Sequence, residues 1–70
     1  METPRTKARR IFEEALATAV QKYLPVEDVM VQAQALNAEG QRVVVARYKL
    51  HVDGRIECFE VLDDVLWPHL

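Results

Sequence analysis

The side chains with the most reactive chemistry are Cys58 and His51, a thiol and an imidazole separated by seven positions. A cysteine becomes a strong nucleophile when a nearby base removes its proton, so this pair is the first candidate for a catalytic site. The strand pattern described below places the two side chains on opposite faces of a sheet, however. We therefore expect Cys58 to be a small core residue, and we expect that the protein is not an enzyme.

A metal site is the second candidate, and it would combine the histidines with acids near the C-terminus: His51, His69, Asp63 and Asp64. No two of these residues have the short spacing of known metal-binding motifs. Glu13 and Glu14 are neighbours in sequence, as are the two aspartates, and such positions are ordinary for a solvated helix face or a strand end. The sequence predicts neither a metal nor a cofactor.

Four basic side chains lie within six positions near the N-terminus: Arg5, Lys7, Arg9 and Arg10. Such a cluster can contact phosphates, so a nucleic-acid-binding module is the alternative function. The rest of the chain does not favour it, because the formal net charge is −2 and residues 53–70 carry five acids against one arginine. A broad basic surface is therefore absent.

Residues 4–24 must position this basic cluster, and their pattern is that of an amphipathic helix. Apolar residues recur at three- and four-residue spacing: Ala8, Phe12, Leu16, Ala19 and Tyr23, widened by Ile11, Ala15 and Val20. Arg9 and Arg10 are expected on the opposite, polar face, each four positions before a glutamate. Thr3 and Pro4 suit the start of the helix, and Pro25 ends it.

Three strands follow the helix, at about 28–36, 42–52 and 55–62, separated by turns at residues 37–40 and at Asp53-Gly54. The expected fold is α+β, a single domain over residues 1–70 with two layers in the order αβββ. One helix packs on a three-stranded antiparallel meander, and a short hydrophobic tail follows. This order is similar to that of a double-stranded RNA-binding domain in topology alone, because the basic final helix of that domain has no counterpart here.

Pairing Leu36 with Val43 makes one face of the first two strands apolar. That face then carries the alternate residues of both strands: Val29, Val31, Ala33 and Ala35 opposite Leu50, Tyr48, Ala46 and Val44. The third strand has three possible alignments. Ile56 and Cys58 face the core if Gly54 forms a bulged turn, Phe59 and Val61 do so after a two-residue turn, and a bulge near Cys58 admits both pairs.

The second sheet face mixes apolar and charged side chains, so we expect something to cover it. Its expected contact residues, with the tryptophan of the tail, are Val43, Val45, Phe59, Val61 and Trp67. Either the tail or a second subunit is the cover. A chain of 70 residues with a single cysteine has no disulfide staple, which favours oligomerisation. We expect a homodimer or another protein partner, and the role of a small interaction or accessory protein.

Half of the residues are apolar, which is typical of a globular protein. The longest apolar run, residues 43–46, is far shorter than the roughly 20 residues that span a membrane. The basic N-terminal segment leads into acids rather than into an apolar segment. We therefore expect a cytoplasmic protein that does not bind membranes.

Overall fold

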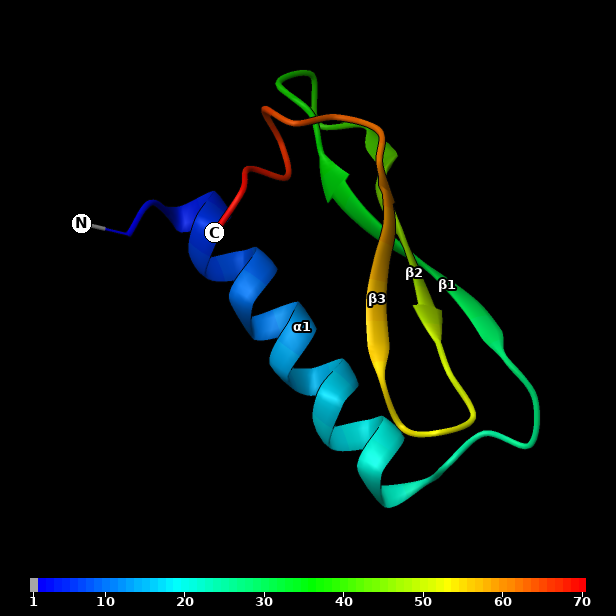
Figure 1. Cartoon of the computed structure of the whole chain (residues 1–70). Coiled ribbons are helices and arrows are strands. Elements are labelled where there is room, and N and C mark those ends of the chain that lie inside the picture. Colours follow the sequence, from blue (N-terminus) through cyan, green and yellow to red (C-terminus); the bar gives the residue numbers. More distant parts are fainter. Residues whose placement is uncertain (1) are drawn as a thin grey trace.

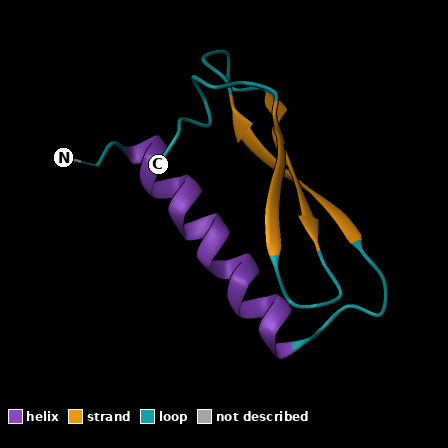
Figure 2. Cartoon of the chain, viewed as in Figure 1, coloured by secondary structure: helices purple, strands orange, loops and turns teal. Residues whose placement is uncertain are grey.

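The fold is a helix followed by a three-stranded antiparallel meander, in a computed structural model that describes residues 2–70 (Figure 1 and Figure 2). Its elements are α1 (Pro4–Lys22), β1 (Val29–Leu36), β2 (Arg42–Leu50) and β3 (Ile56–Val61). The strand order in the sheet is β1-β2-β3, so β2 lies between the two edge strands. The predicted α+β class and element order are confirmed.

The ends of α1 follow from its local sequence. The Thr3 hydroxyl accepts a hydrogen bond from the Thr6 backbone N–H at 3.2 Å, and Pro4 occupies the first turn, where no donor is needed. The helix ends at Lys22, where the Tyr23 N–H still bonds to the Ala19 carbonyl at 2.8 Å. It therefore stops two residues earlier than predicted, ahead of Pro25.

The face that α1 turns inward differs from the predicted one. Phe12, Leu16 and Val20 are buried or half-buried as expected, but Arg9 is buried as well, with 8% of its surface exposed. The prediction that Arg9 lies on the polar face was wrong. The predicted stripe also included residues that are exposed: Ala8, Ile11, Ala15, Ala19 and Tyr23. The bulky side chains at 12, 16 and 20 set the inward face, and Arg9 lies in line with them at helical spacing.

The first half of the β1–β2 register is as predicted, with Val29 opposite Leu50 and Ala33 opposite Ala46. The register then shifts by one, so that Ala35 pairs with Val43, and Leu36 pairs with Arg42 instead of the predicted Val43. Val45 is the extra residue of this bulge. It belongs to the core and is 0% exposed, so its predicted place on the outer face was wrong. Val43 also packs against the core.

The third strand has a bulge next to Cys58, the last of the three alternatives. Tyr48 pairs with Cys58, whereas the adjacent Arg47 pairs with Glu60, so Phe59 is the extra residue. Cys58 and Val61 both pack against the core, and Phe59 is 56% exposed. Because of the bulge, an even-numbered residue, Cys58, and an odd-numbered residue, Val61, both lie on the face of the sheet that α1 covers.

The core is closed by two segments, the middle of α1, from which Phe12 and Leu16 pack against it, and the tail after β3. Figure 1 shows the N-terminal half of α1 diverging from the sheet, with the red C-terminal segment between them. The residues buried there come from β1, β2 and the tail: Ala33, Val45, Ala46, Tyr48, Leu66 and Trp67. Trp67 is 4% exposed, so the tail packs on its own chain. No helix within residues 2–70 has the length and apolarity to cross a membrane.

Candidate functional site

A connected group of polar atoms surrounds the hydroxyl of Tyr48. This hydroxyl donates to Glu13 Oε2 at 2.5 Å and accepts from the Trp67 indole Nε1 at 2.9 Å. Arg9 Nε donates to the same Glu13 oxygen at 3.0 Å. A second nitrogen of Arg9 donates to the Pro68 carbonyl at 3.1 Å. One chain of hydrogen bonds thus joins α1, β2 and the tail.

Local structure brings each member of this cluster into place. Tyr48 lies on the middle strand, and the centroid of the Phe12 ring is 5.2 Å from the centroid of the Tyr48 ring. Phe12 also makes an edge-to-face contact with Trp67, at 5.5 Å and 83°. Asp63 directs the tail, because its carboxylate accepts from the Val65 and Leu66 N–H groups at 3.0 Å. The tail therefore turns back over the core instead of leaving it.

Burial raises the pKa of the Tyr48 hydroxyl far above its usual value, and the hydrogen bond to Glu13 raises it further, while the indole of Trp67 opposes the shift. Burial is the largest single influence on Arg9 and lowers its pKa, but the hydrogen bond to Glu13 and the charge interactions with Tyr48, Glu13 and Cys58 together outweigh it, so the pKa of Arg9 is raised. At neutral pH Tyr48 is protonated and Arg9 is charged. The cluster therefore links α1, β2 and the tail through hydrogen bonds.

The structure does not bring Cys58 and His51 together. Cys58 is half-buried against the core, whereas His51 Nε2 lies 2.8 Å from Glu57 Oε1 and its Nδ1 lies 3.9 Å from Asp28. Within the described residues, no three His, Cys, Asp or Glu side chains are grouped closely enough to hold a metal ion.

The basic cluster near the N-terminus is divided between different partners. Arg9 is hydrogen-bonded to Glu13 and to the Pro68 carbonyl of the tail, as described above. Arg10 makes ion pairs with Glu2 at 3.0 Å and with Glu14 at 3.2 Å. Arg5 and Lys7 are exposed. Two of the four predicted phosphate contacts are therefore neutralised within the chain.

The predicted interface residues do not form one exposed patch. Val43, Val45, Val61 and Trp67 pack in or against the core, which leaves only Phe59 in the solvent. The outer sheet face is instead largely polar, with Arg47 3.5 Å from Glu60 and Lys49 3.6 Å from Asp28. The two bulges explain the difference, because they turn valines inward that a regular register places outside.

In a regular strand Glu57 and Glu60, three positions apart, would lie on opposite faces and could not both protect one face of the β3 edge. The bulge places both on the outer face, opposite Lys49 and Arg47. Bulges and charges are features that discourage edge pairing. Strand β3 is also the one that α1 lies closest to (Figure 1). The β3 edge is therefore guarded.

The β1 edge, on the other side of the sheet, is different. Its eight residues, VMVQAQAL, contain no charged residue and no proline. Natural edge strands usually carry such features, because unpaired backbone groups otherwise recruit another strand. The signal was visible in the sequence as an uncharged run that alternates apolar and glutamine side chains.

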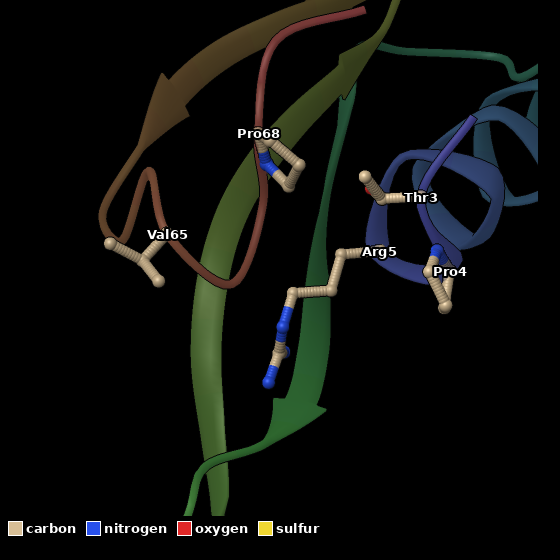
Figure 3. A pocket seen from close by; sticks show the side chains of 5 residues that line it. All are labelled: Thr3, Pro4, Arg5, Val65 and Pro68. Carbon is tan, nitrogen blue, oxygen red and sulfur yellow. The ribbon is translucent and has the colours of Figure 1, made fainter. Parts of the chain in front are cut away.

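An open depression of about 600 Å³ lies between the start of α1 and the tail, lined by Thr3, Pro4, Arg5, Val65 and Pro68 (Figure 3). Among the described residues that line it, Arg5 alone is charged, and the tail contributes the apolar Val65 and Pro68. The Thr3 hydroxyl is used as the cap of α1, and none of the five described lining residues is a general base. Comparison of the chain with protein-family models, with curated proteins and with solved structures gave no match.

Proposed function

We propose that the protein is a small non-catalytic interaction or accessory protein whose working form is a homodimer assembled through its sheet. The observation that supports this most is the surface of the single chain. It exposes 5067 Å², whereas a compact folded monomer of 8.1 kDa is expected to expose about 4,500 Å². The radius of gyration, 12.6 Å, likewise exceeds the value of about 11 Å for a compact domain of this length.

The excess surface is close in size to one side of a protein interface. Stable complexes bury about 800 Å² per partner, and the excess here is about 600 Å². Three residues of β1 contribute to it, since Val29, Met30 and Leu36 are all exposed. Burial against a second copy would add stability that a core this small lacks.

Sedimentation equilibrium from about 1 μM to 1 mM tests the proposal. We expect the average mass to rise toward twice 8.1 kDa as concentration increases. A strict monomer at about 1 mM would overturn the proposal, because contacts worth only about −4 kcal/mol are populated there.

Nucleic-acid binding has less support, since Arg9 and Arg10 are held by carboxylates of the same chain. Titration with duplex RNA and duplex DNA at low and high salt distinguishes the two functions. We expect no salt-sensitive complex. A complex that is tight at low salt, and that is lost both at high salt and on Arg5→Ala/Lys7→Ala substitution, would replace the proposal.

A further inference from the structure

We infer that the two copies associate by antiparallel pairing of β1 with β1, which joins the two three-stranded sheets into one sheet of six strands. This inference rests on the proposed homodimer and assigns its contact surface and register. The occupant of the β1 edge is therefore a second copy of this chain.

The backbone of β1 provides the binding groups. β1 has β2 as its only neighbour in the sheet, so alternate N–H and C=O groups along its eight residues point away from any partner strand. At about 3.4 Å per residue this edge is roughly 27 Å long. No charge along it repels an identical edge, and no proline removes a donor.

Side-chain faces limit the possible registers. Val31 and Ala35 pack on the core side of the sheet, whereas Gln32 and Gln34 are exposed on the other side. Residues opposite each other in an antiparallel pair lie on the same face, so a register must match odd with odd and even with even positions. Registers centred between two residues are excluded, because they place a core-side valine or alanine opposite a glutamine of the other face.

One of the remaining registers matches side chains along the whole edge. With Ala33 of one copy opposite Ala33 of the other, Gln32 faces Gln34, and the two amides can exchange hydrogen bonds. The exposed Met30 then faces the exposed Leu36 at both ends of the interface. Centring on Gln32 instead places Met30 against Gln34 and leaves Leu36 without a partner. The register centred on Ala33 is therefore preferred.

The resulting dimer is closed and free of helix clashes. Antiparallel pairing of identical strands creates a two-fold axis through the pair at Ala33, which gives an isologous contact that cannot extend into a fibre. The axis is perpendicular to the sheet, so both helices lie on the same face. Because α1 lies nearer to β3 than to β1, the helices stand at the far sides of the joined sheet (Figure 1).

A charge-pair experiment at two exposed positions tests this register. Gln32→Lys/Gln34→Lys places lysine opposite lysine at both crossings, whereas Gln32→Lys/Gln34→Glu places lysine opposite glutamate. Both variants carry the same first substitution, so the second controls for effects of that lysine on folding. Far-ultraviolet circular dichroism and urea unfolding in dilute solution verify that each monomer is folded. Phe59→Glu, on the guarded β3 edge, is the control for an interface elsewhere.

Sedimentation equilibrium is the readout. We expect the dimer dissociation constant to rise at least tenfold for the lysine–lysine variant and to stay within about threefold of the parent for the lysine–glutamate and Phe59→Glu variants. Weakening of both β1 variants to the same extent would overturn the register centred on Ala33. A dimer that Phe59→Glu dissociates and the β1 variants do not would overturn the β1 edge while leaving the homodimer intact. A parent chain that never dimerises would overturn both.

Discussion

The indole Nε1 of Trp67 donates a hydrogen bond of 2.9 Å to the hydroxyl of Tyr48, and this bond connects the C-terminal tail with the central strand. Both side chains are almost completely buried. The same hydroxyl donates to Glu13 on α1, so the tail and the helix are attached to one atom of the sheet. The tail is thus a part of the core that closes the gap left by the diverging helix.

Truncation of Trp67 tests this role of the tail. Trp67→Ala should lower the free energy of unfolding by about 3–5 kcal/mol, since it removes a buried aromatic side chain and leaves a cavity. Trp67→Phe should cost less, about 1–2 kcal/mol, because the ring contact with Phe12 is retained while the donor to Tyr48 is lost. Urea unfolding measures both. Leu70→Ala, at an exposed position, is the control, and equal stability of all three variants would contradict a packed tail.

The pH dependence of stability tests the buried state of Tyr48. Its pKa is raised in the folded chain, mainly by burial, and is near 10 in the unfolded chain. The protonated hydroxyl therefore contributes fully to the free energy of unfolding below about pH 10, and this contribution is lost as the pH rises toward the pKa of the folded state. In that window the parent should lose about 1.4 kcal/mol per pH unit relative to Tyr48→Phe, which has no ionisable hydroxyl.

Urea unfolding of the parent and of Tyr48→Phe between pH 8 and 11.5 gives this difference directly. Lysine titration affects both proteins alike and cancels in the comparison. At pH 8 the variant should be less stable by about 1–3 kcal/mol, because Glu13 and Trp67 each lose a partner. Parallel pH curves would contradict the buried, protonated hydroxyl.

The element order and the start of α1 could be predicted because they depend on local signals, such as Thr3 before Pro4 and the change of period after Pro25. The half of the β1–β2 register that runs from Val29 to Ala33 was also predictable, since β2 offers few apolar residues that could lie opposite Val29 and Val31. The bulges were not. A bulge shifts the parity of a strand without altering its composition, so Val45 in a run of valines gave no sign that it turns inward.

Arg9 shows why the polar cluster was missed. A pair of arginine and glutamate four positions apart has the same spacing on an exposed and on a buried helix face, so Arg9–Glu13 and Arg10–Glu14 looked equivalent. The surroundings distinguish the two pairs. Arg9 and Glu13 lie beside the Pro68 carbonyl and the Tyr48 hydroxyl, whereas Arg10–Glu14 is exposed. Tyr48 and Pro68 are distant from Arg9 and Glu13 in the sequence, so the four-residue spacing of Arg9 and Glu13 does not indicate these contacts.

Replacing each arginine separately tests this distinction. Arg9→Ala should destabilise the protein by about 2–3 kcal/mol, because it leaves the Pro68 carbonyl without its donor and removes one of the two donors of Glu13 Oε2 in a partly buried place. Arg10→Ala removes only exposed ion pairs and should change stability by no more than about 0.5 kcal/mol. Thermal and urea unfolding both report the difference. Similar losses for the two variants would show that Arg9 is not part of the core.

Substitution of the two turn glycines tests how closely the end of α1 approaches the β2–β3 turn. Gly40 and Gly54 both have positive φ, +76° and +90°, so alanine is strained at either position by about 1–2 kcal/mol. A Cβ at Gly40 meets nothing within 4 Å, whereas one at Gly54 lies 3.2 Å from Leu24 Cδ2. Gly54→Ala should therefore lower the free energy of unfolding more than Gly40→Ala.

The Leu24 contact can be separated from backbone strain by a double-mutant cycle measured by urea unfolding. If the methyl group at position 54 presses on Leu24, Leu24→Ala should cost less in the Gly54→Ala background than in the parent, by about 0.5 kcal/mol or more. In the Gly40→Ala background the cost of Leu24→Ala should equal that in the parent, since that turn lies at the other end of the sheet (Figure 1). Additive effects of Gly54→Ala and Leu24→Ala would mean that backbone strain alone sets the cost of Gly54→Ala, and that the helix end does not rest against this turn in solution.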